Sequence, residues 1–192
     1  GLLGPSGSGK TTLLRAVLDL VHPQQGSIDI VTISSKDRRA RGNVAYLPGD
    51  LSLPGRRTGE ALLRRFSAAG GGLDTTRVES LAKRLGLDLA RPVGTLSKGN
   101  RQKVGLILAF AKNARVLLLD EPTTGLDPQA KHNLWKLIRN LNQLGMSIVL
   151  TTHNMEEAEN LCNKVAIMDK GKIITEGTPR DLIAKFDSDK AE

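Results

Sequence analysis

The most constraining stretch of this 192-residue chain is a glycine-rich loop near its start. Residues Gly4–Thr12 read G-P-S-G-S-G-K-T-T and fit the pattern G-x-x-x-x-G-K-[ST]. Glycines let the backbone turn several N–H groups toward one anion, and a helix opening near Lys10 adds its positive dipole end. The loop therefore predicts a phosphate site, although a glycine-rich turn before an ordinary helix fits the same letters.

The same pattern assigns roles inside the loop. Lys10 would reach the β- and γ-phosphates of a nucleoside triphosphate, and the Thr11 hydroxyl would be a Mg²⁺ ligand. The predicted triphosphate-binding residues are Gly4, Pro5, Ser6, Gly7, Ser8, Gly9, Lys10, Thr11 and Thr12.

Length and composition set the outer limits. The length predicts one domain over residues 1–192. A phosphate loop normally follows a full buried strand, yet only Gly1, Leu2 and Leu3 precede this one, so we expect N-terminal strands to be missing. No apolar run approaches the roughly 18 residues of a membrane span, and no signal-peptide pattern occurs. The single cysteine, Cys162, excludes an internal disulfide and is interpreted as a packed helix residue.

The net charge of +8 admits three partners: nucleic acid, an anionic membrane surface or a polyphosphate ligand. Much of the excess lies in residues 36–41 and in Arg56, Arg57, Arg64 and Arg65. No nucleic-acid-binding signature accompanies these residues, and only 3% of the chain is aromatic. We therefore favour a solvated basic face and expect no nucleic-acid partner.

Hydrophobic periodicity predicts the elements around the loop. Leu13, Leu14, Val17, Leu18 and Val21 indicate a helix that continues until Pro23, and Ile28, Ile30 and Ile33 indicate a strand. The continuous aliphatic run at 116–119 is typical of a strand buried on both faces of a parallel sheet, and residues 43–47 and 147–151 are predicted as further buried strands. A stripe from Leu134 to Leu144 predicts a helix that ends at Gly145.

Residues from about 55 to 98 have a different character, since no strand pattern occurs there. One helix is predicted around Leu62–Phe66, a break at Gly70–Gly72, and a second helix capped by Asp74 and stopped at Gly86. Towards the C-terminus, residues 164–176 indicate a β-hairpin, and T-P-R-D at 178–181 is a capping box for a last helix. The fold class is therefore α/β: a mainly parallel sheet flanked by helices, with a helical insert and a C-terminal hairpin and helix.

Polar residues follow two of the buried strands. Asp120 and Glu121 come directly after residues 116–119, and His153 follows residues 147–152. Ligands of open parallel sheets bind beyond the carboxyl ends of the strands. Asp120 is the candidate Mg²⁺ holder, Glu121 the base that activates a water, and His153 a γ-phosphate contact. An acidic turn and a structural histidine are the alternatives for the same residues.

A second helix start carries the segment Leu96, Ser97, Lys98, Gly99 and Asn100. Ser97 can cap the following helix, and Gly99 leaves backbone N–H groups open to an anion. The segment is either a second phosphate site or a plain helix cap, and spacing alone leaves both open.

Taken together, these motifs resemble the nucleotide-binding cassette of ABC transporters over essentially the whole chain. Leu96–Asn100 is similar to the signature motif, whose common form is L-S-G-G-Q, and residues 116–121 are similar to the Walker B segment with its catalytic glutamate. Thr124–Asp127 resembles the D-loop, and His153 stands at the switch-histidine position. The resemblance implies a P-loop NTPase core, ATP and Mg²⁺ as ligands, and ATP hydrolysis coupled to transport.

It also implies partners. Two cassettes would form a head-to-tail dimer in which each ATP lies between the phosphate loop of one chain and Ser97 and Gly99 of the other, with Asp127 crossing the interface. The helical insert would dock on a membrane permease at the cytoplasmic face of the cell membrane. The context of Tyr46 and the segment from Thr152 to Glu159 look most like the branch that exports drugs or lipids.

Two departures from the family pattern stand out. The signature has Lys98 and Asn100 in place of glycine and glutamine, while Ser97 and Gly99 remain. Gly49 occupies the position of a glutamine that contacts magnesium and relays to the membrane domain, and Asp50 is a candidate substitute. Metal geometry and coupling are therefore in question. A soluble cassette acting on ribosomes or DNA, and a partner cassette that binds ATP without hydrolysing it, are the alternative functions.

Overall fold

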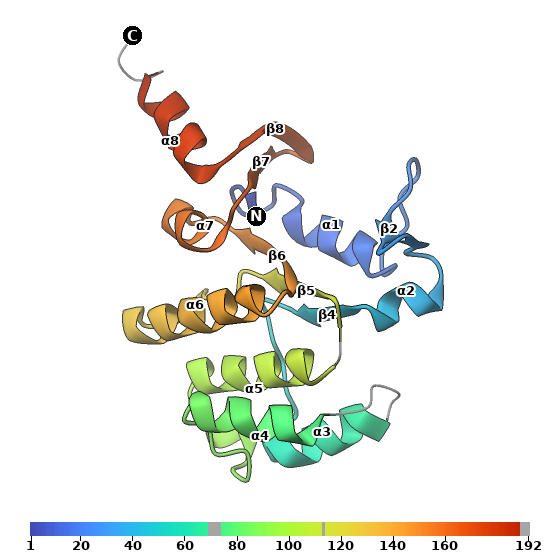
Figure 1. Cartoon of the computed structure of the whole chain (residues 1–192), viewed down its shortest axis with the longest axis vertical. Coiled ribbons are helices and arrows are strands. Elements are labelled where there is room, and N and C mark those ends of the chain that lie inside the picture. Colours follow the sequence, from blue (N-terminus) through green and yellow to red (C-terminus); the bar gives the residue numbers. More distant parts are fainter. Residues whose placement is uncertain (69–73, 113, 189–192) are drawn as a thin grey trace.

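The computed structural model describes residues 1–68, 74–112 and 114–188. Its main sheet has six strands in the order β4-β5-β6-β1-β7-β8 (Figure 1). The strands are β1 (Leu2–Leu3), β4 (Val44–Leu47), β5 (Val116–Asp120), β6 (Ser147–Thr152), β7 (Val165–Asp169) and β8 (Lys172–Gly177). All neighbours pair in parallel except β7 and β8, which form an antiparallel hairpin. The predicted mainly parallel sheet and terminal hairpin are confirmed.

Two layers of helix cover this sheet because its strands are apolar on both faces. Val44 and Leu118 pack with Leu14 of α1 (Lys10–Val17) on one face. Their neighbours Leu47 and Leu117 face the opposite side and pack with α5 (Lys98–Ala111) and α6 (Pro128–Gln143). Figure 1 shows α1 on one side of β4 and β5, and α5 and α6 on the other. Successive side chains of a strand point to opposite faces of the sheet, so the apolar residues of β4 and β5 contribute to two separate cores.

The insert is helical, as predicted. It contains α3 (Gly59–Ala68), α4 (Thr75–Arg84) and a short 3₁₀ turn at Val93–Thr95. The Asp74 carboxylate accepts a 3.0 Å hydrogen bond from the Arg77 amide, and Gly86 ends the helix at a φ of 58°. The predicted break at residues 70–72 lies outside the described residues.

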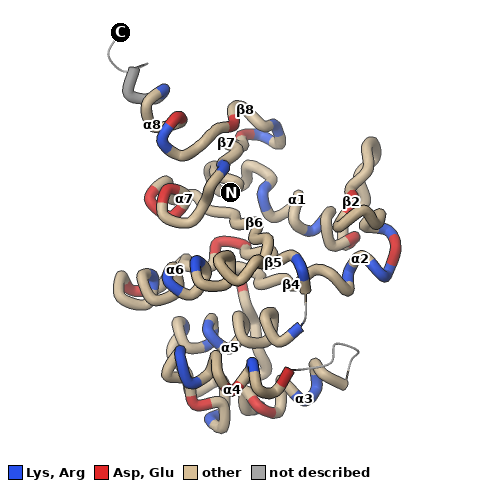
Figure 2. Tube along the Cα trace, viewed as in Figure 1, with Lys and Arg blue, Asp and Glu red and all other residues tan. Residues whose placement is uncertain are grey.

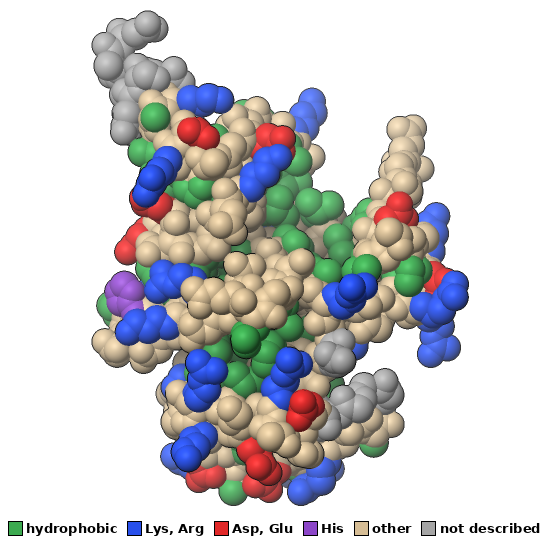
Figure 3. All heavy atoms as spheres, viewed as in Figure 1, with side chains coloured by type: hydrophobic (Ala, Val, Ile, Leu, Met, Phe, Trp, Pro, Cys, Tyr) green, Lys and Arg blue, Asp and Glu red, His purple; other side chains and the backbone are tan. Residues whose placement is uncertain are grey.

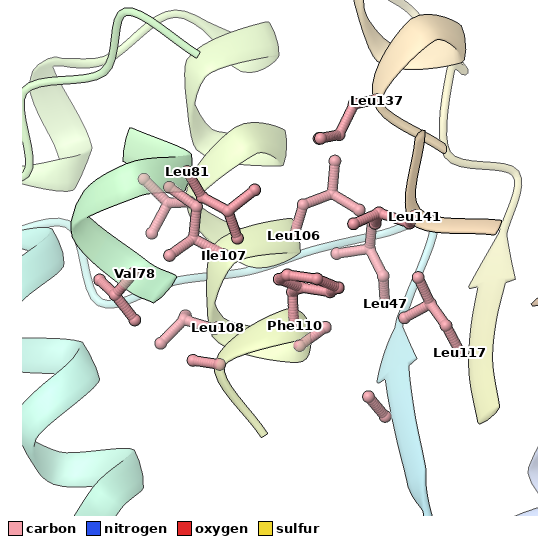
Figure 4. Close-up of a cluster of buried hydrophobic side chains, with 14 of the residues drawn as sticks. Leu47, Val78, Leu81, Leu106, Ile107, Leu108, Phe110, Leu117, Leu137 and Leu141 are labelled. Atoms are coloured by element: carbon pink, nitrogen blue, oxygen red, sulfur yellow. The ribbon is translucent and has the colours of Figure 1, made fainter. Parts of the chain in front are cut away.

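One apolar cluster joins this insert to the sheet. Figure 4 shows Val78 and Leu81 of α4 facing Ile107 of α5, while Phe110 of α5 lies toward Leu117 of β5. Side chains from the insert, the sheet and α6 therefore share one core. Figure 3 shows hydrophobic side chains at the surface between α5 and α6.

Two local predictions were wrong. The first helix ends at Val17 rather than continuing to Pro23, because Asp19 adopts a positive φ of 59° and its carboxylate binds Arg41 at 3.1 Å. The predicted strand around Ile28–Ile33 is instead a hairpin of β2 (Asp29–Ile30) and β3 (Ile33–Ser34). Val31 and Thr32 form its turn at φ values of 51° and 68°, which β-branched residues rarely adopt.

The predicted last helix is confirmed, and the structure adds two short helices that the sequence patterns did not predict, at Met155–Leu161 and Arg38–Gly42. α7 (Met155–Leu161) follows β6, and α8 (Pro179–Ser188) begins after Thr178, whose hydroxyl accepts from the Asp181 amide at 3.2 Å. The basic run forms α2 (Arg38–Gly42), where Arg39 is paired with Asp37. Figure 2 shows lysine and arginine spread over many elements rather than gathered on one of them. Within the described ranges, no helix has both the length and the apolar composition needed to cross a bilayer.

Candidate functional site

The phosphate loop joins β1 to α1 at the carboxyl end of the sheet. Gly7 and Gly9 have φ values of 82° and 105°, in the region that favours glycine. A side chain at Gly4 would collide with the carbonyl oxygen of Met168 on the neighbouring strand β7. The glycines of the sequence pattern are therefore required by turn geometry at two positions and by close packing at the third.

Lys10 is buried inside this loop. Its ammonium donates to the carbonyl oxygens of Gly4 at 2.8 Å and Pro5 at 3.0 Å, and lies 3.6 Å from Glu121 Oε1. The Ser8 hydroxyl is buried and, among the described residues, has no hydrogen-bond partner. A buried cation and an unpaired hydroxyl in a loop of open amides are the features that a phosphate group would satisfy.

Asp120 ends β5 and is held by hydroxyl groups from three other elements. Its Oδ1 accepts from Thr11 at 3.1 Å and from Thr151 at 2.5 Å, and its Oδ2 accepts from Tyr46 at 3.3 Å. Burial of the Tyr46 ring, and next the charge of Asp120, raise the pKa of Tyr46 to about 12. The phenol is therefore a donor at neutral pH.

Thr11 and Asp120 fit a magnesium ion. A hydroxyl and a carboxylate are hard oxygen ligands, and protein Mg²⁺ sites commonly combine one or two such groups with substrate phosphates and waters. The two oxygens are 3.1 Å apart beside the phosphate loop. Across the described part of the chain, no cluster of three or more His, Cys, Asp or Glu residues offers a metal cage of its own.

Glu121 follows Asp120 in an uncommon backbone conformation, with a φ of 44°. Its amide donates to the carbonyl and hydroxyl oxygens of Thr151, both at 3.0 Å. Its carboxylate Oε2 lies 3.0 Å from His153 Nδ1 and accepts from the Thr124 hydroxyl at 3.1 Å. Strained residues of this kind gather at functional sites. β5 and β6 thus bring Glu121 and His153 together, next to Lys10.

The signature segment begins α5 on the other side of the sheet from α1 (Figure 1). Ser97 is exposed and its hydroxyl accepts from the Asn100 amide at 3.2 Å, so the predicted cap is present. Leu96 is buried, and the Lys98 ammonium lies against Gly125 of the D-loop. Asp127, at the end of that loop, caps α6 by accepting from the Ala130 amide at 2.9 Å.

Gly49, at the expected glutamine position, and its neighbour Asp50 lie in different surroundings. The Gly49 backbone packs so close to β5 that a Cβ there would lie 2.8 Å from the Asp120 carbonyl oxygen. Asp50 is exposed and has a minor influence on Tyr46. Among the described residues Asp50 makes no hydrogen bond to Asp120, so its role as a metal ligand stays a prediction.

Sequence reasoning did not identify Tyr46 and Thr151 as partners of Asp120. Thr151 stands opposite Asp120 in the β5–β6 register, and Tyr46 stands opposite Leu118 in the β4–β5 register. Only strand pairing brings these residues together, so no local pattern could have found them. Cys162 is a free thiol at the end of α7, and burial raises its pKa, which makes it a weak nucleophile.

Comparisons with known proteins agree with this geometry. Residues 1–124 match the family model described as ABC transporter. The Nod factor export ATP-binding protein I of Burkholderia thailandensis is 42% identical over 192 residues, covering 95% of this chain and 62% of that protein. The protein of the same name from Sinorhizobium fredii is 40% identical, with 95% of this chain and 55% of that protein covered. The chain therefore spans about 62% of the length of the first relative it matches.

Solved structures show the same fold. One described as the ATP binding subunit of an ABC transporter has a TM-score of 0.85 and 31% identity, with 96% of this chain and 80% of that chain covered. The cbiO1 protein from Clostridium perfringens, part of the complex cbiONQ, has a TM-score of 0.80 and 27% identity, with 96% and 78% covered.

Proposed function

The chain belongs to the ABC transporter family, and on that premise we propose that it binds and hydrolyses ATP to power export through a separate membrane permease. The observation that carries this proposal is the position of Glu121. Its carboxylate lies 3.6 Å from the Lys10 ammonium and 3.0 Å from His153 Nδ1. A base therefore stands beside the cation of the phosphate loop, where the terminal phosphate of ATP would be bound.

In this proposal, residues Gly4–Thr12 bind the triphosphate and Lys10 moves from the loop carbonyls to the β- and γ-phosphates. Thr11 and Asp120 hold Mg²⁺, which neutralises charge on the phosphate oxygens when it is bound. Glu121 orients a water and takes its proton as the water oxygen attacks the γ-phosphorus and ADP leaves. His153 holds the Glu121 carboxylate and contacts the γ-phosphate.

We place the second half of the site on another cassette. Ser97 and Gly99 lie at the start of α5, which covers the face of the sheet opposite α1, so a second chain packed head to tail would supply them to the ATP of the first. Asp127 would lie at that interface. Residues 1–192 would act as one domain at the cytoplasmic face of the membrane.

An apolar groove supports a docking site for the permease. It has a volume of about 560 Å³ and lies between the edge strand β4, the end of α1 and the insert. Leu20 and Phe66 are exposed hydrophobic residues among those that line it. Exposed apolar surface of this kind is typical of a protein contact. The export direction agrees with the name of the relatives, which are Nod factor export ATP-binding proteins. A drug-like or lipid-like cargo rests on the resemblance of the Tyr46 context and residues 152–159 to the exporter branch, and both remain part of the proposal.

The test is Glu121→Gln in the full-length protein. We expect ATP affinity within about twofold of the parent and a turnover reduced by at least roughly 100-fold, because a general base contributes that much. ATP should then hold two chains together, which light scattering would detect. The control is Glu176→Gln, which removes a carboxylate from an exposed ion pair with Lys164. Parent-rate hydrolysis by Glu121→Gln would refute the assigned base.

A further inference from the structure

The Asp120 carboxylate is hydrogen-bonded by a residue to which the sequence analysis gave no role in the site. Thr11 and Thr151 both donate to Oδ1, at 3.1 and 2.5 Å. In the described residues, the only donor to Oδ2 is the Tyr46 hydroxyl at 3.3 Å. Two donors on one oxygen leave the plane of the carboxylate free to turn about them, and a donor on the other oxygen fixes it.

Tyr46 is well placed for this task. It stands on β4, pairs in register with Leu118, and its ring packs on the α1 side of the sheet. The long side chain reaches past the strand end to Asp120, two residues beyond its register partner. A phenylalanine would fill the same space but would donate nothing, so packing and donation can be separated at this position.

The end of β4 holds Asp120 in a second way. Gly49 lies close enough to the Asp120 carbonyl oxygen that a Cβ would stand 2.8 Å from it. Tyr46 thus fixes the side chain of Asp120 while the Gly49 backbone packs on its main chain. Both contacts come from the segment that leads from the sheet into the helical insert.

We propose that Tyr46 is a positioning residue that orients Asp120 for Mg²⁺, an inference that rests on the proposed ATPase function. Mg²⁺ demands near-ideal octahedral geometry, so a carboxylate that can rotate binds it less tightly. Partners that orient metal ligands are worth about 10- to 100-fold in metal affinity. At 3.3 Å the Tyr46 bond is long, and we expect the lower end of that range.

The experiment compares the parent with Tyr46→Phe in the full-length protein. Mn²⁺ affinity is measured by electron paramagnetic resonance in the presence of a non-hydrolysable ATP analogue, and affinity for the analogue is measured separately in EDTA. We expect Mn²⁺ affinity to fall by about 10-fold in Tyr46→Phe. Affinity for the metal-free analogue should stay within about twofold of the parent, since the phosphate loop is unchanged.

Tyr46→Leu is the control for packing. If Tyr46→Phe binds Mn²⁺ like the parent and only Tyr46→Leu is weaker, the ring merely fills space and the inference is overturned. If both variants lose Mn²⁺ affinity and keep metal-free analogue binding, the hydroxyl carries the effect. If the parent itself binds no Mn²⁺ in the presence of the analogue, the proposed metal-dependent ATPase function fails, and this inference fails with it.

Discussion

Gly49→Ala tests whether the missing glutamine is a defect or a structural requirement. The added Cβ would stand 2.8 Å from the Asp120 carbonyl oxygen, 3.5 Å from its carbonyl carbon and 3.6 Å from Glu121 Cβ. Carbon contacts are most favourable at about 3.5–4.0 Å, so the end of β4 would have to move by roughly 0.6 Å. The first atom met is main chain, which cannot turn aside as a flexible side chain can.

The magnitude follows from overpacking. Extra atoms in a well-packed region cost about 1–3 kcal/mol. Replacing glycine also lowers the entropy of the unfolded chain, which offsets about 0.4–1 kcal/mol of that cost. A net loss of about 1–2 kcal/mol would lower Tm by roughly 2–8 °C in a chain of this size. The displaced peptide joins Asp120 to Glu121, so ATPase activity should fall by about tenfold while ATP affinity is retained.

Gly42→Ala is the matched control. Gly42 ends α2, and no atom lies within 4 Å of the position that a Cβ would take. Alanine in a helix is favoured over glycine by up to about 1 kcal/mol, so this variant should be neutral or more stable. Urea unfolding and ATPase assays on both variants decide the point. Gly49→Ala with parent stability and parent turnover would refute the packing argument.

Two further perturbations test other parts of the molecule. Trp135→Phe should lower the free energy of unfolding by about 1–3 kcal/mol, because the buried Glu157 carboxylate would lose the 3.1 Å hydrogen bond from the indole of Trp135. Urea unfolding measures this loss, and a change below about 0.5 kcal/mol would contradict the prediction. Ser97→Arg should prevent ATP-dependent dimerisation in the Glu121→Gln background while leaving monomer ATP affinity nearly intact. A large loss of affinity in the monomer would argue against a site shared between chains.

Local patterns predicted those features of the fold whose causes are local. The apolar run at 116–119 became β5 because a strand buried on both faces must be apolar throughout. Ser97 and Asp74 cap their helices because a short oxygen-bearing side chain can reach the amide three residues ahead. In both cases the physical cause lies within a few residues of its effect.

The errors have long-range causes. The first helix ends in a turn in which the amides of Asp19 and Leu20 donate to carbonyl groups of its last residues. The ion pair between Asp19 and Arg41, 22 residues further on, stabilises that turn. Val31 and Thr32 carry no turn signal, yet the pairing of β2 with β3 places them at positive φ. Tertiary contacts override local propensity at these positions.

Some residues of the candidate site could be predicted from local patterns and others could not. The motifs predicted Lys10, Glu121 and His153 because each follows a strand or opens a helix, and strand ends converge in a parallel sheet. The hydroxyl groups that bond to Asp120 are selected by the register of β4, β5 and β6. The pattern of residues along one sequence does not determine this register.

The interpretation of Gly49 differs between the sequence and the structure. In the sequence, Gly49 occupies a position where the family pattern has a glutamine, which puts metal geometry in question. In the fold, β4 approaches the Asp120 peptide so closely that any side chain at this position would push the two strand ends apart. The same close approach brings the Tyr46 hydroxyl within 3.3 Å of Asp120. A glutamine at position 49 would therefore require a different backbone position at the end of β4. One strand position thus leaves no room for a side chain at residue 49 and brings the Tyr46 hydroxyl to Asp120.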